Sequence, residues 1–108
     1  MRTALAQRRE SVNFTIAFQG ERYDVTVGYY ETGKLGEIFI NRVRNKTAAR
    51  LGDHLDAACR DSAIVMSMLL QYGASLEELR HSVTRDESGE PMSIIGAIID
   101  FLETGNGV

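Results

Sequence analysis

The spacing of the hydrophobic residues changes once along this 108-residue chain, just after Asn45. Before that point apolar and polar residues alternate with a period of two, which is typical of half-buried β-strands. Beyond it, apolar residues recur three and four positions apart, as they do on one face of an α-helix. A run of strands followed by a run of helices predicts an α+β domain whose helices cover one face of a sheet.

Three alternating stretches predict the sheet. The first covers residues 12–18, and the second resumes at Tyr23 after a short turn at residues 19–21. The third covers residues 35–43 and follows the turn at residues 31–34. Matched runs joined by short, glycine-containing turns favour hairpins, so we expect a three-stranded antiparallel meander.

The second half of the chain predicts three helices, one of them long. A heptad stripe indicates a helix from near Thr47 to Tyr72, which Gly73 ends; the stripe consists of Leu51, Leu55, Ala58, Ser62, Val65, Leu69 and Tyr72. Ser75 and Glu78 form the capping-box pattern of a short helix that runs to about residue 83. Ser93 is expected to cap a last helix that is apolar nearly all round, so its second side is predicted to meet another subunit.

The domain boundaries and the partner follow from these elements. Residues 1–11 are predicted to be a flexible basic tail, residues 12–104 a single α+β domain and residues 105–108 a frayed end. One thin sheet and three helices leave apolar area uncovered, so the long stripe and the last helix predict a homodimer.

Composition and charge exclude several classes of protein. The single cysteine, Cys59, excludes a disulfide framework and an all-cysteine zinc site within one chain. A net charge of −3 argues against coating nucleic acid through overall charge. The N-terminus has no apolar run of signal-peptide length, and the apolar stretch 64–70 is far too short to span a bilayer. We therefore expect a cytoplasmic protein with no membrane association and no cofactor.

Three stretches of sequence resemble a known family. They read GKLGEIFI at residues 33–40, SMLLQYGASLEEL at residues 67–79 and SIIGAIID at residues 93–100. Over residues 29–79 the chain resembles the TSCPD domain, found at the C-terminus of vitamin B12-dependent ribonucleotide reductases and as small free-standing proteins; the last stretch is similar to the C-terminal helix of the free-standing forms. The Thr-Ser-Cys-Pro-Asp signature and the paired cysteines of the reductase C-terminus are absent here. The resemblance thus implies the accessory module and argues against reductase activity.

A basic strip is the one candidate binding site. Its members lie within nine residues, with no acid among them, and are Arg42, Arg44, Lys46, Thr47 and Arg50. The strip falls where the third strand gives way to the long helix, whose N-terminus offers free amide donors and the positive end of the helix dipole. This pattern predicts an anion site that would take a phosphate or nucleotide. A solvated loop whose arginines pair with acids elsewhere explains the same residues.

No catalytic constellation is found in the sequence. His54 and Cys59 are five residues apart, about 140° around a helix, so they cannot form a nucleophile–base pair. Cys59 is expected to pack as a small apolar side chain, and His54 to lie on the surface beside acids. Aromatic residues on the strands, such as Tyr23, are interpreted as core rather than as platforms for stacking bases. The chain is therefore predicted not to be an enzyme.

The resulting hypothesis is a non-catalytic accessory or binding module, with a possible nucleotide or phosphate ligand and with a ribonucleotide reductase or another protein as partner. The alternative is a nucleic-acid or phage-type interaction protein that uses the strip from Arg42 to Arg50. Binding that weakens steeply with salt would favour this alternative.

Overall fold

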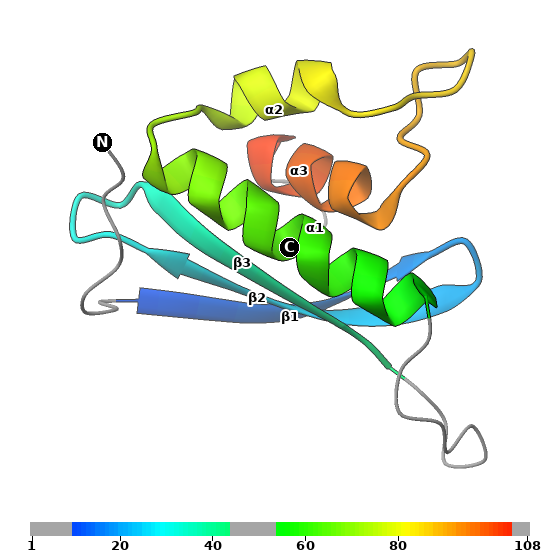
Figure 1. The fold of residues 1–108 in the computed structure, drawn as a ribbon, viewed down its shortest axis with the longest axis horizontal. Helices are drawn as coiled ribbons and strands as arrows, with labels where there is room; N and C mark the ends of the chain where they lie inside the picture. The colour runs from blue at the N-terminus through cyan, green and yellow to red at the C-terminus, as the bar shows by residue number, and fades with distance from the viewer. Residues whose placement is uncertain (1–9, 44–53, 105–108) are drawn as a thin grey trace.

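The computed structural model describes residues 10–43 and 54–104 and shows a sheet covered on one side by three helices (Figure 1). The elements are β1 (Glu10–Phe18), β2 (Glu21–Tyr29), β3 (Leu35–Arg42), α1 (His54–Gln71), α2 (Leu76–Ser82) and α3 (Ile94–Thr104). The strands pair antiparallel in the order β1-β2-β3. This confirms the predicted fold class, an antiparallel meander followed by three helices. Strand β1 begins at Glu10, two residues before the expected boundary at residue 12.

The register of the sheet places its apolar side chains on one face. Phe14 pairs with Val25, which in turn pairs with Ile40, so the three lie in one row across the strands. The turn between β1 and β2 is tight because Gln19 and Gly20 both adopt positive φ, 53° and 79°, as a two-residue hairpin loop with the twist of its strands requires.

Helix α1 lies along β3, as Figure 1 shows, and forms most of the cover over that side of the sheet. Its end agrees with the prediction: the helix stops at Gln71, and Gly73 follows with a φ of 110°. The predicted start near Thr47 and the stripe residue Leu51 lie outside the described residues.

Helix α3 is covered within a single chain, which differs from the prediction that its second side meets another subunit. Its isoleucines are almost fully buried, namely Ile94, Ile95, Ile98 and Ile99. One side of α3 meets β1, where the rings of Phe14 and Phe101 stack with centroids 4.5 Å apart. Helix α2 packs on another side. Helix α1 contacts α3 as well. Because β1, α2 and α1 all pack against it, the apolar surface of α3 is buried without a partner chain.

The two predicted helix caps are both present. The Ser75 hydroxyl accepts the Glu78 amide at 3.1 Å, and the Glu78 carboxylate accepts the Ser75 amide at 2.9 Å. The Ser93 hydroxyl accepts the Gly96 amide at 3.1 Å at the start of α3. Each cap satisfies amide groups that the first turn of a helix leaves without an intrahelical acceptor.

Candidate functional site

Arg42, the first member of the predicted anion strip, is held in an ion pair against α1. Its Nε lies 2.9 Å from a carboxylate oxygen of Asp56, and both side chains are largely buried. Glu21 approaches the same guanidinium from β2, with its carboxylate 3.8 Å away. The charge of Arg42 is thus balanced inside the fold. For this arginine, the structure agrees with the alternative interpretation of the strip, in which the arginines pair with acids elsewhere in the chain. The other members, Arg44, Lys46, Thr47 and Arg50, lie outside the described residues, so the anion site stays a prediction.

Tyr23 and Cys59 lie beside this ion pair and line a common pocket. Both residues are about 2% exposed, which confirms that Cys59 packs as part of the core. Burial raises the pKa of the Tyr23 hydroxyl above its usual value of 10.0. The nearby Cys59 and the carboxylate of Glu21 raise it further, while the Arg42 cation acts in the opposite direction. This end of the molecule therefore has a neutral phenol among acidic neighbours.

Further along α1, polar side chains bind the outer edge of β3. The Ser67 hydroxyl accepts the Ile38 amide at 2.8 Å; its own proton has two acceptors within reach, the carbonyl of Ala63 at 2.8 Å and that of Ile38 at 3.2 Å. The Gln71 amide donates to the carbonyl of Gly36 at 3.0 Å. An edge strand normally exposes such groups as a template for another strand. Here α1 occupies two positions of that edge, so β3 is poorly suited to extend the sheet.

The residues that α1 buries are small or polar, with Leu70 as the one bulky apolar member among the described positions. The buried positions are Asp56, Cys59, Ala63, Ser67, Leu70 and Gln71. Bulky members of the predicted heptad stripe are instead exposed: Val65 is 54% exposed, Leu69 is 41% and Tyr72 is 59%. Ile64 and Met68 widen this exposed strip. We call the five residues Ile64, Val65, Met68, Leu69 and Tyr72 the outer face of α1.

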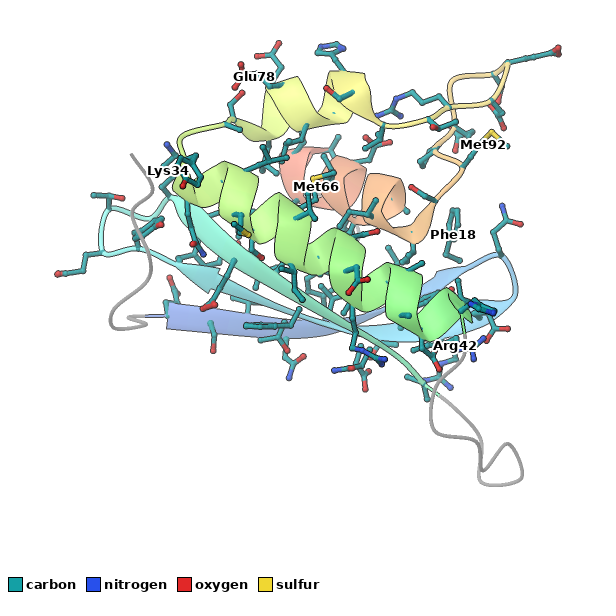
Figure 2. The ribbon with its side chains drawn as sticks, in the orientation of Figure 1. Phe18, Lys34, Arg42, Met66, Glu78 and Met92 are labelled. Atoms are coloured by element: carbon teal, nitrogen blue, oxygen red, sulfur yellow. The ribbon has the colours of Figure 1, made fainter. Side chains whose placement is uncertain are left out.

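A second pocket brings together two of the stretches on which the predicted TSCPD resemblance rests. It lies between the turn that precedes β3 and the end of α1, and has a volume of about 450 Å³. The turn contributes Tyr30 and Lys34, and the helix end contributes Gln71 and Tyr72. Figure 2 shows Lys34 at this end of α1, far from Phe18 and Arg42. The hydrogen bond from Gln71 to Gly36 ties the two stretches together just beneath the pocket.

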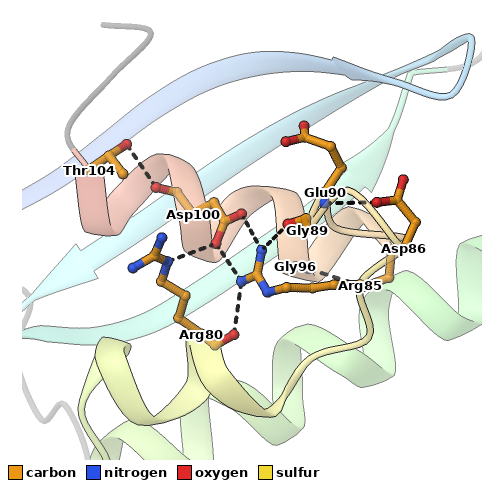
Figure 3. Close-up of polar contacts among 9 residues, drawn as sticks. Arg80, Arg85, Asp86, Gly89, Glu90, Gly96, Asp100 and Thr104 are labelled. Carbon is orange, nitrogen blue, oxygen red and sulfur yellow. Dashed lines mark hydrogen bonds and ion pairs between the residues drawn. The ribbon is translucent and has the colours of Figure 1, made fainter.

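The loop between α2 and α3 is held by an arginine clamp (Figure 3). Both terminal nitrogens of Arg85 donate to the carboxylate of Asp100 at 2.8 Å, and they also reach the carbonyls of Arg80 and Gly89. The hydrogen bond from Arg85 holds the pKa of Asp100 below its usual 3.8. Such bidentate geometry fixes the loop against α3, and a structural role accounts for all of these contacts.

The acidic segment at residues 86–90, beside the Arg85–Asp100 contact, is a turn. One carboxylate oxygen of Asp86 accepts the amides of Ser88 and Glu90 and the Ser88 hydroxyl, at 2.7 to 3.0 Å. These bonds, chiefly that from the Ser88 hydroxyl, lower the pKa of Asp86. An oxygen already receiving three hydrogen bonds closes the loop on itself, as an Asx turn does.

Other candidate chemistry is absent from the described part of the chain. No group of three or more metal-ligating side chains gathers within residues 10–43 and 54–104. In those same ranges no helix has the length and hydrophobicity to cross a bilayer. His54 is exposed at the start of α1, in agreement with the prediction, and His81 is exposed beside Glu77 at 4.0 Å.

Within the described residues, the fold and these surfaces define an α+β domain with a helix-covered sheet, surface pockets near both ends of α1 and an exposed apolar face on that helix. No protein-family model matches the chain. No curated protein and no solved structure matches it either.

Proposed function

We propose that this protein is a non-catalytic binding module that acts as a homodimer paired through the outer face of α1. The observation that carries the proposal is the exposure of five large apolar side chains side by side on one helix, from Ile64 to Tyr72. Contiguous apolar surface of this kind is costly to leave in water and is typical of interaction sites.

The order of residues along this face favours a second copy of the chain as its occupant. In an antiparallel pair centred between Met66 and Ser67, Val65 meets Met68 of the other copy, and Ile64 meets Leu69. The same register sets Asp61 opposite Tyr72, whose hydroxyl can donate to the carboxylate. A two-fold axis repeats every contact, so one self-complementary patch serves both partners. A parallel pair would place Asp61 against Asp61, which repels.

The competing mode of self-association, strand pairing along β3, is disfavoured by the contacts of α1. Ser67 and Gln71 already bind the outward-facing groups of Ile38 and Gly36. Adding a strand there would break both sets of hydrogen bonds and leave buried polar groups without partners. Pairing of helix faces requires no such loss.

A direct measurement of oligomeric state tests the proposal. Analytical ultracentrifugation of the full chain at micromolar concentration is expected to give a dimer, and Val65→Asp is expected to give a folded monomer. Val12→Asp is the matched control, because Val12 is 44% exposed on β1, far from α1, and undergoes the same change. A monomeric wild type, or a Val65→Asp dimer as tight as that of the control, would refute the proposal.

For the predicted nucleotide-related ligand we propose the pocket beside Tyr30 and Tyr72 as the site. Tyrosine rings offer stacking surfaces for a base, and Lys34 provides a charge for a phosphate. Thermal-shift measurements with nucleotides, deoxynucleotides and cobalamins test this ligand class. A rise with one nucleotide that Lys34→Ala abolishes would support the assignment, and no shift across the panel would remove it. The TSCPD resemblance makes a ribonucleotide reductase the first protein partner to test.

A further inference from the structure

A pocket at the opposite end of the molecule has the chemistry of a small-molecule site. It lies where the β1–β2 hairpin, the first turns of α1 and the start of α3 meet, and has a volume of about 420 Å³. Figure 2 shows Phe18 on the hairpin and Met92 on the loop before α3, on the same side of the molecule as Arg42. This volume falls within the range of ordinary ligand pockets, roughly 300–1,000 Å³.

The interior of this pocket is apolar and is suited to a ring. Tyr23, Cys59, Ile94 and Ile95 are buried residues that line it, so this part of the wall is fixed by the core. The Cys59 sulfur and the exposed thioether of Met92 are polarisable groups, and sulfur makes favourable contacts with aromatic rings. A flat apolar group would therefore find contacts on several sides.

One carboxylate, that of Glu21, supplies the polar anchor. Glu21 lines the pocket, and its side chain is 43% exposed. Its cationic neighbour Arg42 is bound more closely by Asp56, at 2.9 Å against 3.8 Å, so the Glu21 carboxylate keeps room for a second cation. The N-terminus of α3, which would favour an anion, is already capped by the Ser93 hydroxyl.

From this arrangement we propose that the pocket binds a small aromatic ammonium compound, with its ring against Cys59 and its cationic group paired with Glu21. The Glu21 carboxylate, one of the groups that raise the pKa of Tyr23, also favours a positive over a negative ligand in this pocket. The site is independent of the outer face of α1 and of the pocket beside Tyr30, and its ligand differs in charge from a nucleotide.

Two probes of similar size and opposite charge test the site. The full chain, labelled with ¹⁵N, is titrated to millimolar phenethylamine and to millimolar 3-phenylpropanoate while amide shifts are followed. The amine is expected to shift amides of residues around the pocket and to bind more tightly than the carboxylate. Equal binding of the two probes, tighter binding of the carboxylate, or no shifts around Cys59 would overturn the proposal.

Three variants locate the interaction. Glu21→Gln is expected to weaken amine binding about fivefold, the worth of a partly exposed ion pair, and to leave the carboxylate unaffected. Ser62→Leu places a larger side chain in the pocket from a half-buried position on α1, and is expected to abolish binding. Val65→Asp is expected to bind the amine as wild type does, so failure of the homodimer and failure of this site give different results. Unchanged binding in both pocket variants would refute the assignment.

Discussion

The hydrogen bonds of Ser67 to the edge of β3 give the sharpest test of how this fold is held together. Ser67→Ala removes the acceptor of the Ile38 amide in a buried place. An amide left without a partner costs roughly 1–3 kcal/mol, and alanine returns up to about 0.5 kcal/mol through its higher helix propensity. The free energy of unfolding should therefore fall by about 1–2 kcal/mol, which lowers the Tm of a domain this size by about 5–10 °C.

Urea denaturation measures the loss of stability, and amide hydrogen exchange measures the loss of protection at the Ile38 amide. The matched control is Ser62→Ala, which makes the same chemical change five residues earlier on α1, at a half-buried position. Stability should fall in Ser67→Ala and stay within about 0.5 kcal/mol of wild type in the control. The Ile38 amide should exchange faster in Ser67→Ala alone. Equal stability of the two variants, together with unchanged protection of the Ile38 amide, would show that the hydrogen bonds from α1 do not protect the edge of β3.

Three further predictions concern ion pairs and a cap. Asp56→Ala should destabilise the domain by about 3–5 kcal/mol, measured by urea unfolding, because it leaves the guanidinium of Arg42 largely buried beside an empty position. Asp100→Asn should be less stable than wild type at pH 7, and the difference should shrink as pH falls below about 4. The sign follows because the lowered pKa of Asp100 stabilises the fold only while the carboxylate is charged and paired with Arg85; a gap that stays constant in melts down to pH 2 would contradict this. Ser75→Ala should cost about 1 kcal/mol through loss of the helix cap, and an unchanged urea midpoint would contradict that.

Much of the fold could be predicted because its signals are local. The alternation along β1 and β2, the capping box at Ser75 and the left-handed stop at Gly73 each depend on a few neighbouring residues. The first two residues of β1, Glu10 and Ser11, could not be predicted as strand because both are polar and exposed on an edge strand, so they show no alternation.

The contacts of single side chains could not be predicted, because they depend on tertiary neighbours. Arg42 is an ordinary member of a basic run in the sequence, and only the packing of α1 against β3 shows that Asp56 holds it. Pockets likewise form between segments distant in sequence: Glu21 and Cys59 line one cavity but are 38 positions apart. The apolar residues all round α3 indicated burial correctly, but sequence alone does not distinguish cover by α1, α2 and β1 from cover by a second subunit.

Residue size explains why the most apolar side of α1 is not its buried side. A helix that lies against the edge of a strand must come close enough to reach backbone groups, and Ser67 and Gln71 bind those groups at 2.8 and 3.0 Å. Bulky side chains such as Val65 or Leu69 at these positions would hold the helix away and supply no hydrogen bond. Small and polar residues therefore occupy the positions that reach the backbone of β3, with Leu70 buried beside them, and the five residues of the outer face remain exposed. Exposing these apolar side chains to water is unfavourable, and lysine or glutamate at the same positions would avoid that penalty. Contact with a second copy of the chain would remove it while keeping the apolar residues.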